Sequence, residues 1–474
     1  MATGTGTRDD VIIPISEEPV WLFQIIKGED PPGRSKPCIQ EVAKTLSKIE
    51  SNKTCFHPCV VSFGPYHHGK HHLKPMEHYK EVASRWFISL TAGNNRVGAI
   101  TNEEAKNVYD KFIAKVPSVS SLRECYTDGA TDEYNDADFL RMMFLDGCFI
   151  LYFIHLVVEG SDDLLQKGHY LNQPLIIRDM FLFENQIPYS VLTALMSLKP
   201  EHCGHGSVVY FIYMIFLPPR GFSFISHMIT YFGLLVLGQV TLTMKEEPCD
   251  HLLDLLRSQV INEAAGSSSS RSGHWHYYFR PISELKAVGI QVSASNSQSW
   301  SDVKFRKGFI NSHLELPQII VDDSTKTRLL NLAAYEMCPD GSLYRAVTSY
   351  ICFLDSLIYN VDDVKELRYN NILLNRLGSD EEVANLFKEL ATNLSPESNA
   401  YSDVILGMEE HSKRHFNHVR LWISQFFHNN FTSPWTAISL VAGIFVILLT
   451  LVQTIYSVLS YYKRRYCVEY GLLG

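Results

Sequence analysis

The sequence predicts a mainly α fold: a single large helical domain with few short strands, followed by a C-terminal transmembrane helix. Three observations lead to this fold class. Apolar residues recur at helical spacing along much of the chain, alternating strand patterns are scarce, and residues 421–462 contain no Asp, Glu, Lys or Arg. With 474 residues, 46% of them hydrophobic and 20% charged, the chain also has the composition of a globular protein.

The first part of the chain is predicted to be a poorly ordered leader. Residues 1–35 begin with alternating Thr and Gly, end in Pro31, Pro32 and Gly33, and hold only a short apolar stretch between. Charged side chains in the first twenty positions leave no apolar run of signal length, so we expect no secretory signal. The helical domain is then expected to occupy residues 36–430.

Three helices are predicted in the first half of this domain. Residues 76–90 carry apolar side chains on one helical face. Residues 139–158 are apolar on nearly every face, which predicts a central helix enclosed by others. Residues 179–198 predict a second buried helix, bent near Pro188 because proline removes a backbone donor.

The second half is predicted to contain further helices, short strands and loops. Helices are expected at residues 324–337, 342–359 and 379–390, and the best strand candidates are residues 289–293 and 316–321. Ser379 followed by Glu382 forms a capping box at the start of the last helix. Two stretches rich in Ser, residues 262–275 and 293–301, cannot bury enough apolar surface to order themselves, so we expect flexible loops.

One other stretch, residues 222–244, is long enough to cross a bilayer. His227, Gln239 and several hydroxyl side chains make it less apolar than the C-terminal segment. Residues 222–244 are therefore interpreted either as a buried core helix or as a second membrane span.

Residues 434–462 are predicted to form the transmembrane helix, followed by a short basic-led tail at residues 463–474. About 20 apolar residues in a helix span a hydrocarbon core of about 30 Å, and this segment meets that length. The predicted anchor residues are Trp435, Leu440, Phe445, Leu448, Leu451 and Tyr456. The protein is thus expected to cross a membrane once, with the plasma membrane as the predicted location and membrane lipid as one partner.

Two orientations of this anchor remain open. Insertion after synthesis would leave the large domain in the cytosol, whereas the basic residues directly after the span favour a cytosolic tail and an exterior domain. Asn52 and Asn393 begin sequons that are usable for glycosylation only in the second orientation. Ser439 and Gly443, four residues apart, form a small-residue pair that would let two anchors pack closely, so a homodimer is left open.

The charge balance excludes one class of partner. A formal net charge of −9 and the lack of any run of five basic residues argue against nucleic-acid binding. Ten cysteines at irregular spacings are interpreted as mostly reduced and buried rather than as a disulfide framework.

One cluster has residue types that suit zinc. The candidate ligands are Cys55, His57, Cys59, His67 and His68. Their spacing does not supply two ligand pairs at defined offsets, and Gly and Pro residues interrupt the regular structure between them. We therefore expect a solvent-facing His-rich turn, no metal and no cofactor.

No standard catalytic motif appears in the sequence, so no catalytic residue and no enzyme are predicted. Polar residues inside apolar segments are given structural roles instead. Glu184, Asn185 and Gln186 are expected to bond backbone atoms freed near Pro188, and Asp146 is expected to form a buried ion pair or hydrogen bond.

A series of ordered motifs resembles the plant family catalogued as domain of unknown function 247. The motifs include VVSFGPYHHG at residues 60–69, LDGCFI at 145–150, DMFLFENQIP at 179–188 and LAAYE at 332–336, with others at residues 73–80, 251–256, 302–305, 314–317 and 434–435. The resemblance covers about residues 38–462. It implies a plant protein with a helical domain and a C-terminal span, and it implies no catalytic residue.

The resemblance also bears on function, because some grass members of the family are linked to pollen self-incompatibility. The leading prediction is a membrane-anchored plant protein of unknown biochemical activity that acts as a protein-interaction or recognition module for an unidentified protein partner. The alternative is a metal-dependent enzyme that uses the cluster from Cys55 to His72.

Overall fold

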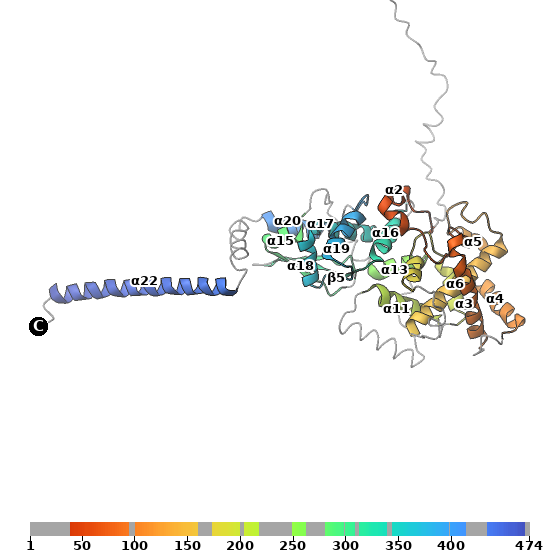
Figure 1. Ribbon diagram of the computed structural model, residues 1–474, viewed down its shortest axis with the longest axis horizontal. Coiled ribbons are helices and arrows are strands. Elements are labelled where there is room, and N and C mark those ends of the chain that lie inside the picture. The colour runs from red at the N-terminus through yellow and green to blue at the C-terminus, as the bar shows by residue number, and fades with distance from the viewer. Residues whose placement is uncertain are drawn as a thin grey trace, which may run out of the picture.

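The computed structural model has a helical body and a separate C-terminal helix, which lies apart from the body in Figure 1. It describes residues 38–93, 100–159, 173–199, 203–217, 249–261, 280–297, 299–308, 312–338, 344–397, 399–413 and 434–469. The predictions for residues 1–35, 222–244 and 262–275 fall outside these ranges. In the described part, helices predominate and strands are few and short, so the predicted fold class is confirmed.

The first half of the body contains helices α2 to α13 with two short 3₁₀ helices, η1 and η2. Their bounds are α2 Lys44–Ser47, η1 Glu50–Cys55, η2 His71–Leu73, α3 Lys74–Ala92, α4 Asn102–Lys115, α5 Val119–Arg123, α6 Asp136–Glu159, α8 Gln173–Met180, α9 Tyr189–Met196, α11 His205–Phe216 and α13 Leu252–Val260.

The second half contains the strands and the remaining helices. Their bounds are α15 Ile282–Ala287, β1 Ile290–Ala294, β2 Lys304–Arg306, β3 Ser312–Leu316, β4 Ile319–Val321, α16 Thr325–Glu336, α17 Ala346–Leu357, α18 Val361–Tyr369, β5 Leu373–Asn375, α19 Asp380–Leu390, α20 Ser402–Lys413 and α22 Pro434–Glu469.

Helix α6 is the centre of the first half, as its all-round apolar sequence predicts. It has the length and hydropathy of a membrane span, but 72% of its most apolar window is buried inside the body. Helices α3, α9 and α11 pack against it. Gly147 lets α9 approach closely, since a Cβ there would lie 2.5 Å from Leu195 Cδ1. Most of α6 is buried, as expected of a core helix.

Two small sheets lie in the second half. β3 is central in the first, parallel to β1 and antiparallel to β2, with Ile290 opposite Ser312 in register. β4 pairs in parallel with β5. The predicted strand at residues 316–321 is instead divided between β3 and β4, with Pro317, which has no backbone donor, just after β3 ends.

Two further expectations differ from the structure. Residues 179–198 do not form one bent helix, because α8 ends at Met180 and α9 begins only after Pro188, its N-cap. Residues 293–301, expected to be a flexible loop, begin inside β1 and include the buried Trp300, which stacks on Tyr350 at 5.4 Å between ring centroids. The Trp300 side chain supplies apolar burial that the Ser residues around it cannot supply.

The three later helices form close to their predicted positions, as α16, α17 and α19. At the start of α19, Ser379 accepts a hydrogen bond from the Glu382 amide, which is one half of the predicted capping box, and the Ser379 hydroxyl donates to the Glu382 carboxylate.

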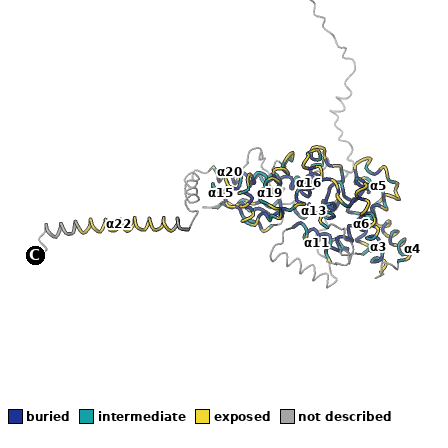
Figure 2. The backbone as a smooth tube through the Cα atoms, viewed as in Figure 1, coloured by how far each residue is buried: buried dark blue, intermediate teal, exposed yellow. Residues whose placement is uncertain are grey.

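Helix α22 has the length and composition of a membrane span. Its Val441–Ser460 segment has a mean hydropathy of 2.2, and none of it is buried. Among the predicted anchor residues, Phe445, Leu448, Leu451 and Tyr456 are exposed, and Trp435 and Leu440 lie in the same helix. Figure 2 shows the contrast with the body, where the interior is buried.

Candidate functional site

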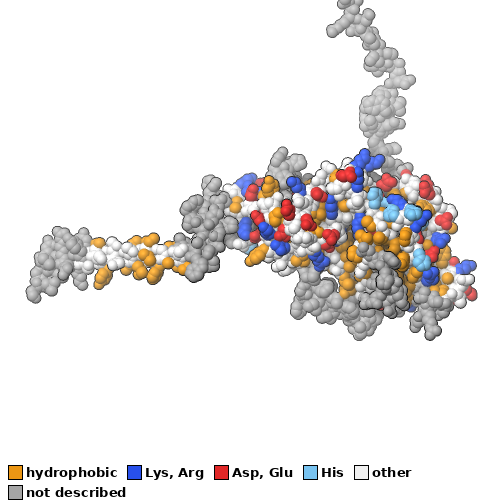
Figure 3. Space-filling view, in the orientation of Figure 1, with side chains coloured by type: hydrophobic (Ala, Val, Ile, Leu, Met, Phe, Trp, Pro, Cys, Tyr) orange, Lys and Arg blue, Asp and Glu red, His pale blue; other side chains and the backbone are white. Residues whose placement is uncertain are grey.

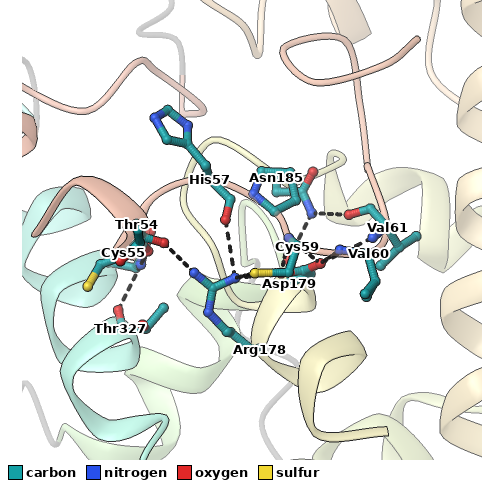
Figure 4. Close-up of polar contacts among 12 residues, drawn as sticks. Thr54, Cys55, His57, Cys59, Val60, Val61, Arg178, Asp179, Asn185 and Thr327 are labelled. Carbon is teal, nitrogen blue, oxygen red and sulfur yellow. Dashed lines mark hydrogen bonds and ion pairs between the residues drawn. The ribbon is translucent and has the colours of Figure 1, made fainter. Parts of the chain in front are cut away.

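The loop between η1 and η2 is held in place by two adjacent residues at the end of α8. Arg178 donates from Nη1 to the His57 carbonyl at 3.1 Å and to Cys59 Sγ at 3.1 Å, and from Nη2 to the Thr54 carbonyl. Figure 4 shows these contacts, with the His57 ring pointing away from the Arg178 side chain. The backbone of His57 is thus fixed while its ring stays exposed.

Asp179 fixes the next part of the loop. Its Oδ2 accepts hydrogen bonds from the amides of Val60 at 2.7 Å, Cys59 at 2.9 Å and Val61 at 3.1 Å. The carboxylate is fully buried. Burial raises the pKa of Asp179, and the three amides and Arg178 offset only part of this effect.

Asn185 and Gln186 bond backbone groups of the segment between α8 and α9, the structural role that the sequence predicts. Asn185 accepts from the Phe63 amide at 2.7 Å and donates to the carbonyls of Val61 and Asp179. Gln186 donates to the carbonyls of Met180 and Leu182, both at 2.8 Å. These buried amides satisfy backbone atoms that a helix would otherwise have paired.

Asp146 of α6 forms the buried ion pair that was expected. Its Oδ1 lies 2.7 Å from Lys80 Nζ, and its Oδ2 accepts from the Gly64 amide at 2.8 Å. Lys80 also contacts Glu77 at 2.8 Å. The motifs at residues 60–69, 73–80, 145–150 and 179–188 therefore meet in one polar network.

Beside this network lies an open groove of about 980 Å³. Its ionisable and imidazole side chains are Glu41, Lys44, Lys53, His57, Cys59, Tyr66, His67, Lys70, His72 and Glu184. On the face seen in Figure 3, histidine side chains gather in one area beside Lys and Arg side chains.

His57, His67 and Glu184 converge in this groove. Their nearest nitrogen and oxygen atoms all lie within 4.8 Å of one another. His67 Nε2 is 3.3 Å from Glu184 Oε2, and Glu184 Oε1 accepts from the Val42 amide at 2.8 Å. His67 Nδ1 lies 2.6 Å from Lys70 Nζ. The arrangement joins two imidazoles and a carboxylate, a set that can ligate a divalent metal.

The pKa values of His57 and Glu184 are both lowered, for different reasons. Burial lowers the pKa of His57, and the nearby Glu184 offsets only part of this effect. Burial alone raises the pKa of Glu184, but His67, the Val42 amide and His57 outweigh it, so the pKa is lowered. Glu184 is therefore ionised at neutral pH and able to act as an anionic ligand.

The structure brings together two of the five residues named as metal candidates from the sequence. Cys55 is buried in the hydrophobic core, Cys59 lines the groove with its thiol against Arg178, and the His68 ring contacts the Tyr134 ring at 5.9 Å. Glu184 was assigned a structural role only. Nothing in the sequence spacing relates it to His67, because the fold alone brings the two segments together.

The two glycosylation candidates differ in accessibility. The Asn52 side chain is fully buried in η1, so a glycan there would require this segment to open, which argues against Asn52. Asn393 is exposed and stays a prediction.

A second cleft, of about 890 Å³, lies between α15 and α18. Tyr369 at the end of α18 lines it and is 84% exposed, and Tyr359, just before the same helix, is 83% exposed. Lys286 and Glu366 form an ion pair of 2.9 Å across the cleft.

Comparisons with known proteins agree with the resemblance of the motifs. Residues 39–449 match the family described as a plant protein of unknown function, domain of unknown function 247. The chain is 27% identical to the UPF0481 protein At3g47200 of Arabidopsis thaliana over 481 residues, which cover 95% of this chain and 91% of that protein. It is 21% identical to the UPF0481 protein At3g02645 of the same plant over 545 residues, 94% of this chain and 96% of that protein. No solved structure matches the chain.

Proposed function

We propose that this chain, which belongs to the plant family of domain of unknown function 247, is a single-pass membrane protein whose helical body binds a protein partner. The proposed location is the plasma membrane. A more specific form of this proposal is that the protein acts in recognition during pollen self-incompatibility. That role requires the protein to accumulate in pollen.

The exposed apolar surface of α22 carries the proposal. Twelve of the twenty residues in Val441–Ser460 are Val, Ile, Leu or Phe. At about 0.3–0.6 kcal/mol each, their transfer into a bilayer is favourable by on the order of 5 kcal/mol. Twenty helical residues at about 1.5 Å each also match a hydrocarbon core of about 30 Å. Water is a poor solvent for this surface and lipid a good one.

The cleft between α15 and α18 supports the proposal that the helical body binds a protein partner. Tyr359 and Tyr369 are the most exposed of the large apolar side chains described in the body, and Arg368 lines the cleft together with Tyr369. Tyr and Arg are enriched at the centres of protein interfaces, where a large side chain contributes contact area with little loss of conformational freedom. The mixed charges that line this cleft suit a polar rim.

Site-specific cross-linking in native membranes tests the binding surface. A photoreactive phenylalanine analogue replaces Tyr369 in one full-length variant and, in another, Ile113, an exposed residue of α4 at the opposite end of the body from α18 (Figure 1). We expect a discrete protein adduct from position 369 that Tyr359→Ala suppresses, and none from position 113. Equal adducts from both positions, or none from position 369, would contradict the proposal.

The same proposal assigns no catalytic activity to the body. Turnover by the purified full-length chain in a broad screen of hydrolase and transferase substrates would overturn that assignment.

A further inference from the structure

One buried polar atom near the groove lacks a good partner. His67 is 2% exposed, and its Nε2 has no well-directed hydrogen bond among the described residues, although Glu184 Oε2 faces it at 3.3 Å. Buried polar atoms in proteins are nearly always paired, and a metal ion bound between His67 and Glu184 would pair both side chains.

We propose that His57, His67 and Glu184 bind a divalent transition-metal ion, with Zn²⁺ as the best fit. Two imidazoles and one carboxylate are a known zinc ligand set that leaves a fourth position open. Bonds of about 2.0–2.2 Å in tetrahedral geometry place ligand atoms roughly 3.3–3.6 Å apart. His67 Nε2 and Glu184 Oε2 already have this spacing, at 3.3 Å.

His57, the third ligand, reaches the metal by rotation of its side chain alone. The three ligand atoms lie within 4.8 Å of one another, and the His57 ring is exposed, so a rotation closes the rest of the distance. Its backbone stays fixed, because Arg178 binds the His57 carbonyl at 3.1 Å. The Val42 amide holds the second oxygen of Glu184 at 2.8 Å, as outer-shell groups commonly do in zinc sites.

The donor set also limits which ions fit. Imidazole with carboxylate suits Zn²⁺ and related transition metals better than Ca²⁺ or Mg²⁺, which prefer sites made of oxygen atoms. The groove of about 980 Å³ leaves the fourth position accessible to water or to a group of a bound partner.

Lys70 competes with the metal. Its ammonium, 2.6 Å from His67 Nδ1, requires that nitrogen to accept a hydrogen bond, which leaves the ring proton on Nε2. A metal bound at Nε2 requires the opposite tautomer. Lys70 is exposed and can swing away, so metal binding displaces it. Removal of the Lys70 charge is therefore expected to strengthen binding.

Metal titration of the full-length chain in detergent tests the site. The chelator-treated protein is titrated with Zn²⁺ against a chromophoric chelator, and Co²⁺ is used to record visible absorption bands. We expect one equivalent bound, with the strong bands of a four- or five-coordinate site. His57→Ala, which removes an exposed side chain, should weaken binding at least about 10-fold. Lys70→Met should tighten it several-fold.

The exposed His71, at the start of η2, provides the matched control, and His71→Ala should leave the affinity unchanged. Three results would overturn the proposal. These are substoichiometric binding by the wild type, equal weakening by His57→Ala and His71→Ala, and a Lys70→Met variant that binds no tighter. Far-UV circular dichroism of each variant separates loss of a ligand from loss of fold.

Discussion

Replacement of Gly64 by Ala tests whether the polar network fixes the fold. Gly64 has a φ of +68°, and a Cβ there would lie 2.5 Å from the Gln186 carbonyl oxygen and 3.0 Å from the Tyr126 hydroxyl. Gly69 in the same loop has a φ of +77°, with nothing within 4 Å of its Cβ position. Both substitutions introduce the same left-handed strain, and only Gly64→Ala adds a clash with backbone.

The expected magnitudes follow from these contacts. An L-residue in the left-handed region costs about 1–2 kcal/mol, which is the whole effect expected for Gly69→Ala. At position 64 the Gln186 carbonyl must also move, which adds about 1–3 kcal/mol of overpacking. The shift weakens the 3.1 Å hydrogen bond from the Tyr126 hydroxyl to that carbonyl, a further loss of about 1 kcal/mol. Gly64→Ala should therefore lower the free energy of unfolding by about 2–4 kcal/mol more than Gly69→Ala does.

Urea denaturation of the full-length chain in one detergent measures the difference. Intrinsic tryptophan fluorescence reports unfolding, and the free energy of unfolding of each variant is compared with that of the wild type. Equal losses for the two variants would refute the reasoning, because they would mean that the approach of the loop to Gln186 has no energetic consequence.

Two further predictions concern buried charge. Asp179→Asn keeps the shape of the side chain but replaces one acceptor oxygen by a donor that faces backbone amides. We therefore expect the free energy of unfolding to fall by about 2–4 kcal/mol in the same denaturation assay. The exposed Asp110→Asn is the control and should leave it unchanged. His251 is fully buried, and its pKa is lowered to about 4 mainly by burial, with Asp250 and the Cys38 carbonyl opposing that effect. The unfolded chain binds this proton near pH 6.5 and the folded chain only near pH 4, so stability is full above pH 6.5 and falls by about 3 kcal/mol as the pH drops towards 4. His251→Asn, which retains an N-cap residue for α13, should flatten the pH dependence of urea denaturation over that window, and the exposed His71→Asn should not.

The elements that the sequence predicts well are those with a local cause. Helix α6 follows from apolar residues on every face, and α19 from Ser379 and an amphipathic pattern. The break between α8 and α9 was missed because its cause is not local. The Asp179 side chain, in the last turn of α8, binds backbone amides from Cys59 onward, 120 residues earlier in the chain, a contact that no periodicity reveals.

The sequence indicates the region of the candidate site but not which of its residues come together. The residue types of His57 and His67 indicate metal affinity, but the order of the chain gives no reason to prefer them to Cys55 or His68. Their selection depends on which side chains the network leaves facing the groove, and Glu184 enters the site only through the turn that Asn185 and Gln186 stabilise. Tertiary contacts, rather than spacing, therefore decide the ligand set.

The central claim is that α22 anchors the protein in a membrane, and alkaline carbonate extraction of membranes from cells that express the full-length chain tests it most directly. Two arginines near the middle of the span, Leu448→Arg with Leu451→Arg, cost about 5–7 kcal/mol together, enough to cancel the gain from the apolar residues. Leu406→Arg, in α20 of the body, provides the matched control. We predict that the wild type and Leu406→Arg stay in the membrane pellet while the double variant is released. Release of the wild type, or retention of the double variant, would contradict the account.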